Sequence, residues 1–143
     1  MLPDFHHITP YRIPFADLDM MQHVNHRAYI RWAETTRSEY FVEILGEKIN
    51  GTRGLILVNV AFTYERQLTF REPVLIGTRV ARIGRRSIDF AYEIFSESQQ
   101  QITTRGRTTM VAYNYLDHES LLVPPEWREK IAAYEHKLPE GLA

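Results

Sequence analysis

One helical segment with an aromatic stripe precedes four β-prone runs, and this order constrains the fold most. Between about His26 and Leu45, apolar side chains recur at steps of three and four, which is typical of one face of a helix. This face holds Tyr29, Trp32, Ala33, Thr36, Tyr40 and Ile44, and the opposite face holds Arg27, Arg31, Glu34 and Ser38. Asn25 is the predicted N-cap and Gly46 the predicted stop. So many aromatic side chains require a large apolar surface beneath them.

The rest of the chain reads mostly as strands. In "ILVNVAFTY", residues 56–64, apolar side chains alternate with smaller or polar ones, which predicts one face on the core; the core-facing set is Ile56, Val58, Val60, Phe62 and Tyr64. Further β-prone runs cover 73–83, 87–96 and about 102–116. Residues 7–15 contain two prolines, which favours an edge or interrupted strand. After Pro124 and Pro125, residues 126–138 are expected to form a short helix.

Consecutive strands with short connections predict an antiparallel sheet, here of about five strands. The long helix is expected to lie across one sheet face, which makes the fold class α+β. With 143 residues and no linker-like segment, we expect a single domain over 1–143. Apolar residues on the second face and an unprotected edge strand favour dimerisation through the sheet.

Composition excludes several classes of function. Seventeen basic and eighteen acidic residues give a formal charge of −1, so no global charge attracts nucleic acid or an anionic membrane. The chain has no cysteine, which excludes disulfides, a thiolate nucleophile and cysteine-ligated metals. No apolar run approaches the roughly 20 residues of a membrane helix, and the N-terminus does not resemble a signal peptide. We therefore expect a soluble, cytoplasmic protein.

Two carboxylates and two imidazoles crowd the entrance of the predicted helix. Asp17, Asp19, His23 and His26 lie within "FADLDMMQHVNHRAYIRWAETTR", residues 15–37. One interpretation is a catalytic site at a helix N-terminus, where free N–H groups and the helix dipole stabilise a developing oxyanion. The other is a turn followed by a capped helix. A metal site is the least favoured reading, because these residues lack an H-E-x-x-H type of spacing, so we expect none.

The run D-x-D-x-x-x-x-V-x-H-x-x-Y resembles the entrance motif of hotdog-fold acyl-CoA thioesterases. It is formed here by Asp17, Asp19, Val24, His26 and Tyr29. The resemblance is greatest to the 4-hydroxybenzoyl-CoA thioesterase family, including its bacterial branch associated with the Tol-Pal system. Element order and length agree with that family over nearly the whole chain. The implied fold is an antiparallel sheet wrapped around one long central helix.

The resemblance also implies roles for individual residues. Asp19 would be the catalytic carboxylate, acting as base or nucleophile, and the His26 backbone N–H would polarise the thioester carbonyl. The His26 imidazole is equally a candidate for a direct role. Family members often have glycine at the position of Gln22, a departure that would alter the loop path or narrow the acyl pocket. Asp17 is expected to brace the loop.

Other residues have less specific assignments. His23 is expected to have a structural role. Tyr29 and Trp32 are expected to belong to the core, and Tyr29 is also able to touch the acyl group. Glu34 is expected to pair with Arg31 or Arg37 on the helix surface.

A turn between two predicted strands, "GRRS", carries two arginines and a hydroxyl. Guanidinium groups recognise phosphate through paired donors. The resembling enzymes have basic residues at this turn that contact coenzyme A phosphates, so Arg85, Arg86 and Ser87 are the candidates, against the alternative of a solvated turn. Arg105 and Arg107 form a weaker second patch. The family's second carbonyl-polarising amide would fall within 51–54.

The resemblance implies hydrolysis of an acyl-CoA to a carboxylic acid and coenzyme A. No separate cofactor is expected, because coenzyme A is part of the substrate. A homodimer, or a tetramer built from two dimers, would share each site between two chains. A non-catalytic acyl-CoA-binding module is the alternative, and a hotdog dehydratase or hydratase is a third reading. Aromatic, short branched and long fatty acyl groups all remain open.

Overall fold

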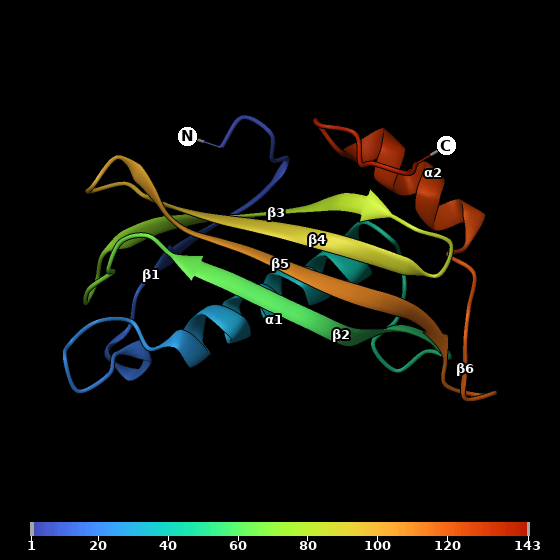
Figure 1. Ribbon diagram of the computed structural model, residues 1–143, viewed down its shortest axis with the longest axis horizontal. Coiled ribbons are helices and arrows are strands. Elements are labelled where there is room, and N and C mark those ends of the chain that lie inside the picture. The colour runs from blue at the N-terminus through green and yellow to red at the C-terminus, as the bar shows by residue number, and fades with distance from the viewer. Residues whose placement is uncertain (1, 143) are drawn as a thin grey trace.

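Strands and one long helix form two layers in the computed structural model, which describes residues 2–142 (Figure 1). In chain order the elements are β1 (His7–Arg12), the 3-10 turn η1 (Phe15–Asp17), α1 (His26–Glu43), β2 (Arg53–Tyr64), β3 (Pro73–Ile83), β4 (Ser87–Ser96), β5 (Gln101–Asn114), β6 (Glu119–Ser120) and α2 (Pro125–Tyr134). The α+β class and the order of elements confirm the prediction. Among residues 2–142, no helix is long and apolar enough to cross a membrane.

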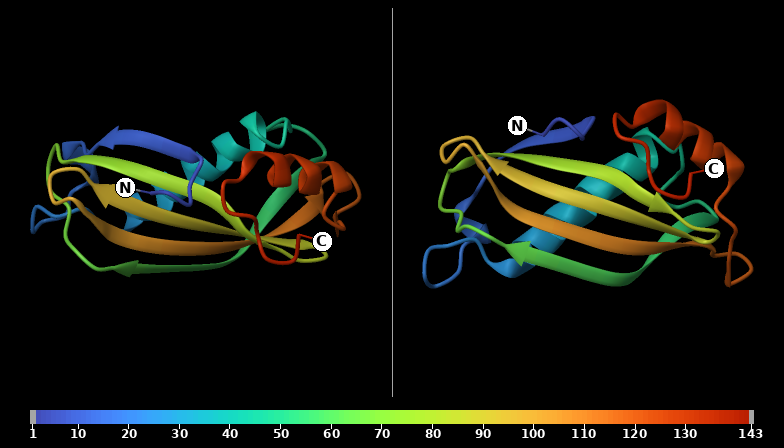
Figure 2. Two further views of the ribbon diagram at one scale, coloured as in Figure 1. Left: turned by 90° about the horizontal axis from the view of Figure 1, so that it is seen from above. Right: turned by 45° about the horizontal axis from the view of Figure 1, so that its top comes forward.

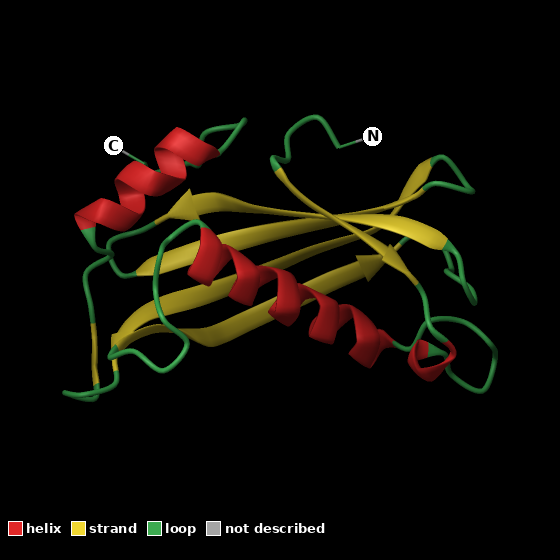
Figure 3. Ribbon diagram, turned by 180° about the vertical axis from the view of Figure 1, so that it is seen from behind, coloured by secondary structure: helices red, strands yellow, loops and turns green. Residues whose placement is uncertain are grey.

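The sheet is antiparallel, with strand order β1-β3-β4-β5-β2 and the two-residue β6 paired to β5. Helix α1 lies diagonally across one face of this sheet, and the other face carries no helix of comparable length (Figure 3). Seen from above, the twisted strands pass over α1, while α2 sits at one end of the sheet (Figure 2). This is the hotdog arrangement. The predicted edge position of the proline-containing first strand, β1, is confirmed.

The sequence of α1 explains both its ends and its buried face. The Asn25 side chain accepts a hydrogen bond from the Arg27 backbone N–H at 2.9 Å, which confirms the predicted N-cap. Helix α1 ends at Glu43, two residues before the predicted limit, and Gly46 follows with φ +72°. The stripe that faces the sheet is buried, as predicted, apart from the partly exposed Ile44; the buried members are Tyr29, Trp32, Ala33, Thr36 and Tyr40.

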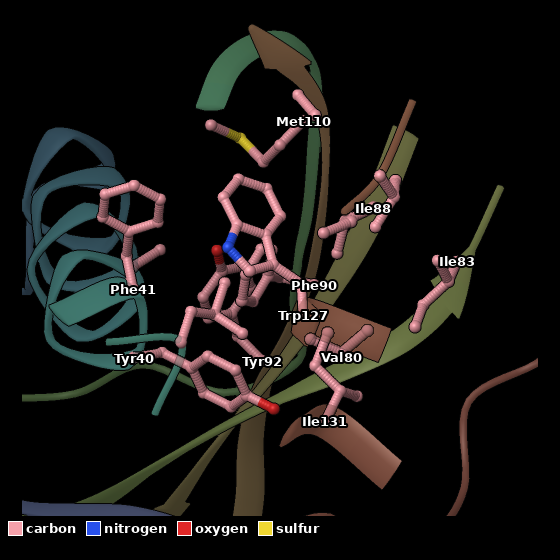
Figure 4. Packing of buried hydrophobic residues seen from close by; sticks show 14 residues of the cluster. Tyr40, Phe41, Val80, Ile83, Ile88, Phe90, Tyr92, Met110, Trp127 and Ile131 are labelled. Atoms are coloured by element: carbon pink, nitrogen blue, oxygen red, sulfur yellow. The ribbon is translucent and has the colours of Figure 1, made fainter. Parts of the chain in front are cut away.

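The main core lies between α1, the sheet and α2 (Figure 4). In β4 the side chains at alternate positions are buried as predicted: Ile88, Phe90, Tyr92 and Ile94. From α2, Trp127 and Ile131 are both fully buried against this cluster. The core therefore joins the C-terminal helix to the far end of α1.

The alternation predicted for β2 is wrong in its first half. The register with β5 shifts between Leu57 and Asn59, so Val58 is an extra residue in a β-bulge. Cross-strand neighbours share a sheet face, and Leu57 pairs with the buried Met110, which puts Leu57 rather than Val58 on the α1 side. The side chains of Leu57, Val58 and Val60 remain 43%, 57% and 38% exposed at this free edge.

The C-terminal helix is shorter than the predicted 126–138. Helix α2 ends at Tyr134: the Glu135 N–H still donates to the Ile131 carbonyl at 2.9 Å, but Glu135 takes an extended conformation with ψ 137°. The Glu135 carboxylate turns into the core, where it accepts hydrogen bonds from the Tyr40 hydroxyl at 2.6 Å and the Val80 backbone N–H at 2.8 Å. These tertiary bonds outweigh the helix propensity of the next residues.

Candidate active site

The loop before α1 closes on itself in a tight turn. Leu18 and Val24 form an antiparallel bridge, the Asp19 N–H donates to the His23 carbonyl at 2.8 Å, and the Gln22 N–H donates to the Asp19 carbonyl at 3.0 Å. Gln22 has φ +64°, in the left-handed region that glycine favours. Gln22 therefore adopts a backbone conformation suited to the glycine common at this position in the resembling family.

Asp17 anchors this loop to α1, as predicted. Its buried carboxylate accepts hydrogen bonds from the Trp32 indole N–H at 3.0 Å and the Tyr11 hydroxyl at 3.1 Å, and it pairs with Arg31. Its backbone carbonyl accepts the Asn25 N–H at 2.8 Å, just before the helix begins. Asp17 is therefore fully occupied in holding the turn against the helix.

Asp19, two residues later, is exposed and only partly engaged. Its Oδ1 accepts the backbone N–H groups of Met21 at 2.8 Å and His23 at 3.3 Å. Within residues 2–142, Oδ2 has no hydrogen-bond partner. One oxygen thus fixes the orientation of the carboxylate, and the other is available to a water molecule or a substrate carbonyl.

His26 is the first residue of α1, and its backbone N–H points out of the helix start. The Asn25 cap is used by Arg27 and Ala28, whereas no described residue accepts a hydrogen bond from the His26 N–H. An unpaired N–H at the positive end of the helix dipole is suited to polarise a carbonyl. The His26 side chain is exposed, and no described residue is hydrogen-bonded to it.

Asp19 and His26 line the same pocket, of about 210 Å³. Its remaining walls come from Val24, Tyr29, Tyr64 and Gln67. The loop after β2 reaches the site because the Leu68 carbonyl accepts the Val24 N–H at 2.9 Å. Sequence reasoning missed Gln67, since nothing in the pattern "ERQLTF" indicates that this loop packs beside Asp19.

Tyr29 is both a core residue and a wall of the pocket. Its side chain is buried, and its ring lies 4.8 Å from that of Tyr64, centroid to centroid. Burial raises the pKa of the Tyr29 phenol to about 12. The phenol therefore stays neutral near pH 7 and offers a hydroxyl rather than a charge. His23 does not line this pocket.

The candidate phosphate-binding residues lie far from this pocket in a single chain. They occupy the turn between β3 and β4, at the opposite end of the sheet from the loop before α1 (Figure 1). The Arg86 guanidinium donates to the Ser120 carbonyl at 2.9 Å, and the Ser87 hydroxyl accepts from Arg82 at 2.8 Å. Among residues 2–142, the Arg85 side chain has no hydrogen-bonded or ionic partner.

The second predicted amide, within 51–54, also lies at the far end of β2 from Tyr64. Arg105 pairs with Glu65 and Glu93, and Arg107 pairs with Asp89, so neither guanidinium is free for phosphate.

The predicted pairing of Glu34 is wrong. Arg31 pairs with Asp17 instead, and no described residue forms an ion pair with Glu34. Within residues 2–142, no cluster of three or more potential ligands is placed to hold a metal ion.

Comparison with known proteins identifies the superfamily. The family model of the thioesterase-like superfamily matches residues 13–131. No functionally curated protein matches the sequence.

Solved structures share the fold over most of their length. The PA5185 protein of Pseudomonas aeruginosa strain PAO1 is 26% identical, with a TM-score of 0.83 over 94% of this chain and 95% of that one. A 1,4-dihydroxy-2-naphthoyl-CoA thioesterase from Synechocystis is 15% identical, with a TM-score of 0.76 over 87% and 94%. The SAV2348 protein from Staphylococcus aureus, solved in complex with CoA, is 14% identical, with a TM-score of 0.82 over 93% and 85%. With its family match over most of its length, this chain belongs to the thioesterase-like superfamily.

Proposed function

We propose that this protein hydrolyses the thioester of an acyl-CoA to a carboxylic acid and coenzyme A. One observation carries the proposal: a carboxylate oxygen of Asp19 and the backbone N–H of His26, both without a described hydrogen-bond partner, belong to residues that line one pocket. Superfamily membership supports thioester chemistry, and two fold neighbours are named for a CoA thioester or for bound CoA. We also place the chain in the 4-hydroxybenzoyl-CoA thioesterase family and its Tol-Pal-associated branch, on the strength of the D-x-D motif. A cytoplasmic location stays a prediction.

The chemistry requires few groups. The thioester carbonyl oxygen accepts the His26 N–H, and loss of one such donor typically raises a barrier by roughly 3–4 kcal/mol. Asp19 takes a proton from water, the water oxygen bonds to the carbonyl carbon, and the C–S bond breaks with its electron pair on sulfur. Because a free thiol has a pKa of about 8.5, the thiolate leaves without a strong acid.

A direct attack by Asp19 is the second route. Its carboxylate oxygen bonds to the carbonyl carbon, the thiolate leaves, and water then cleaves the resulting anhydride. In ¹⁸O-labelled water, label in the Asp19 carboxylate after a single turnover would establish the anhydride route with water attacking the Asp19 carbonyl carbon, because the general-base route puts the label only into the product acid.

A panel of acyl-CoAs with a thiol reagent tests the function. Wild type should release coenzyme A from at least one of them, and Asp19→Asn should lose roughly 10²–10⁴-fold in kcat/KM. Full activity of Asp19→Asn would remove Asp19 from the mechanism. His26→Ala keeps the backbone N–H, so its rate separates a role of the imidazole from a role of the amide.

The binding-module alternative makes a different prediction. Calorimetry would then detect tight binding of acyl-CoA without turnover of any panel member, and Asp19→Asn would leave the affinity unchanged.

We further propose that two copies pair through β2. This strand is an edge of the sheet, and it presents unpaired backbone groups together with the partly exposed Leu57, Val58 and Val60. Antiparallel pairing about the strand centre would carry Arg85 and Arg86 of the second copy toward the Asp19 end of the first, where they would hold coenzyme A phosphates. A dimer of dimers is compatible with this contact.

Val58→Lys should dissociate the pair, measured by analytical ultracentrifugation, while Ile8→Lys, partly exposed on the opposite edge strand β1, serves as the control. An unchanged sedimentation coefficient for Val58→Lys would contradict pairing through β2.

A further inference from the structure

A second pocket, of about 260 Å³, lies between the middle of α1 and the beginning of β2. Glu34, Arg37 and Ser38 line it from α1, and Arg53 and Gly54 line it from β2. Its other walls are mainly apolar or aromatic. The pocket is therefore a small, mixed-polarity space on the sheet side of the helix. At 1.5 Å per residue, Arg37 lies about 16 Å along α1 from His26.

Arg37 is the unusual member of this pocket. Its residue surface is only 9% exposed, yet no carboxylate oxygen of residues 2–142 lies within 4.0 Å of its guanidinium nitrogens. Its one described hydrogen bond goes to the Tyr92 hydroxyl at 3.2 Å. A buried charge without a counter-charge is expensive, so proteins normally pair or ligate it.

Neighbouring groups do not neutralise Arg37. Burial raises the pKa of the Tyr92 phenol above its usual value, an effect larger than the opposing influence of Arg37 itself, so the phenol is uncharged near pH 7. Glu34 is exposed and forms no ion pair with Arg37. Arg53 already pairs with Glu47 and Glu126. Among the described charges, Arg37 alone faces this pocket as a buried cation without an anion.

Strand geometry places this pocket relative to the candidate active site. Tyr64, at the end of β2, lines the Asp19 pocket, and Gly54, at its beginning, lines the Arg37 pocket. In an antiparallel pair centred on the middle of two β2 strands, Tyr64 of one copy lies beside residues 53 and 54 of the other. The two pockets would then meet across the interface.

We propose that Arg37 of one copy binds a carboxylate at the far end of the acyl group whose thioester lies at Asp19 of the other copy. This inference rests on the proposed thioesterase function and on pairing through β2. The substrates would then be CoA thioesters of short dicarboxylic acids.

The pocket, of about 260 Å³ and open to solvent, accommodates a short acyl group. Glutaryl-CoA, with a five-carbon acyl group ending in a carboxylate, satisfies both the size and the charge. Pentanoyl-CoA is its neutral counterpart of the same chain length.

Hydrolysis of this pair by wild type is the first test. We expect kcat/KM for glutaryl-CoA to exceed that for pentanoyl-CoA by roughly tenfold or more, the range for hydrogen bonds to a charged group. Equal rates, or a preference for pentanoyl-CoA, would overturn the inference without affecting the proposed function. This comparison needs no variant, so it decides even if a substitution prevents folding.

Substitution of Arg37 is the second test. Arg37→Met should lower kcat/KM for glutaryl-CoA by roughly tenfold or more and leave pentanoyl-CoA hydrolysis unchanged, whereas Arg37→Lys should retain part of the preference. Arg53→Met is the matched control, because its guanidinium lines the same pocket but is already paired. Loss of the preference for glutaryl-CoA in Arg53→Met but not in Arg37→Met would assign binding of the acyl carboxylate to Arg53 instead.

A third test locates Arg37 in the partner chain. Neither Asp19→Asn nor Arg37→Met should hydrolyse glutaryl-CoA well alone. A randomised equal mixture should recover about a quarter of the wild-type rate, because half of the dimers are mixed and each has one intact site of two. No recovery would mean that both residues act within one chain.

Failure of the proposed function has its own signature. If neither acyl-CoA is hydrolysed, calorimetry still tests Arg37: wild type should bind glutaryl-CoA roughly tenfold or more tightly than pentanoyl-CoA, and Arg37→Met should not. Equal affinities would end the proposal.

Discussion

Replacement of each aspartate of the D-x-D pair by asparagine should separate stability from activity. Asp17 is buried and accepts two side-chain hydrogen bonds besides its pairing with Arg31. In Asp17→Asn the amide oxygen can keep one donor, and the NH₂ group then faces the other. One buried donor without an acceptor costs about 1–3 kcal/mol. Since the Arg31 side chain is 54% exposed, its ion pair adds at most about 1 kcal/mol.

The expected destabilisation by Asp17→Asn is therefore about 1–4 kcal/mol. At roughly 3 °C per kcal/mol for a chain of this length, Tm should fall by about 3–12 °C. Asp19→Asn is the matched control: its Oδ1 acceptor is retained and the residue is exposed, so stability should change by less than about 1 kcal/mol.

Urea unfolding followed by tryptophan fluorescence measures the free energy of unfolding of both variants. All samples have the same protein concentration, because association shifts the apparent stability. In the acyl-CoA assay the effects of the two variants should be reversed. Asp19→Asn should be inactive, and folded Asp17→Asn should retain activity to the extent that the loop before α1 stays intact. A stable but inactive Asp17→Asn, or a destabilised but active Asp19→Asn, would refute the division of roles.

Three further predictions concern the scaffold. Burial, the largest influence, raises the pKa of Glu135 despite its hydrogen bonds, so its ionisation removes stability as pH rises from the unfolded pKa of about 4.3 through the higher folded pKa. In urea unfolding, the free energy of unfolding of Glu135→Gln should rise relative to that of wild type as pH increases across this window. Parallel pH profiles of the two free energies would contradict this. Gly106→Ala would place a Cβ in steric overlap with the Phe62 ring and should cost about 1–3 kcal/mol, seen as a lower urea midpoint; an unchanged midpoint would mean that the ring shifts freely. Gln22→Gly should raise stability by up to about 1 kcal/mol through relief of the left-handed backbone, and a lower Tm would show that the glutamine side chain contributes more than this strain.

Local patterns predicted those parts of the fold that depend on neighbouring residues. The helix at 26–43 follows from its period, its Asn25 cap and Gly46, and β4 follows from strict alternation over a buried face. Both were predictable because the buried face of each element packs against one continuous layer. The entrance loop was also predictable, since Asp19 and His26 are separated by only a short turn.

Contacts between distant segments explain the features that the sequence patterns did not predict. The β-bulge at Val58 depends on register with β5, which no pattern within β2 encodes. The end of α2 depends on Glu135 bonding to Tyr40, 95 positions earlier in the chain. Gln67 reaches the pocket only because the Leu68 carbonyl meets Val24. Each of these is a contact between segments distant in sequence.

The two ends of β2 carry different parts of the proposed site. The carboxylate and helix amide lie at the Tyr64 end, whereas the candidate phosphate turn and the Arg37 pocket lie toward the Arg53 end. At about 3.3 Å per residue, the 12-residue β2 separates the candidate phosphate turn from the Asp19 pocket by roughly 40 Å, too far for one small acyl-CoA to engage both within a chain. Arg37 itself lies about 16 Å along α1 from His26. Antiparallel pairing through β2 removes this separation and also protects the sheet edge. If this reasoning is right, a folded monomer should be inactive, and specific activity should fall on dilution at the concentration where the sedimentation coefficient falls.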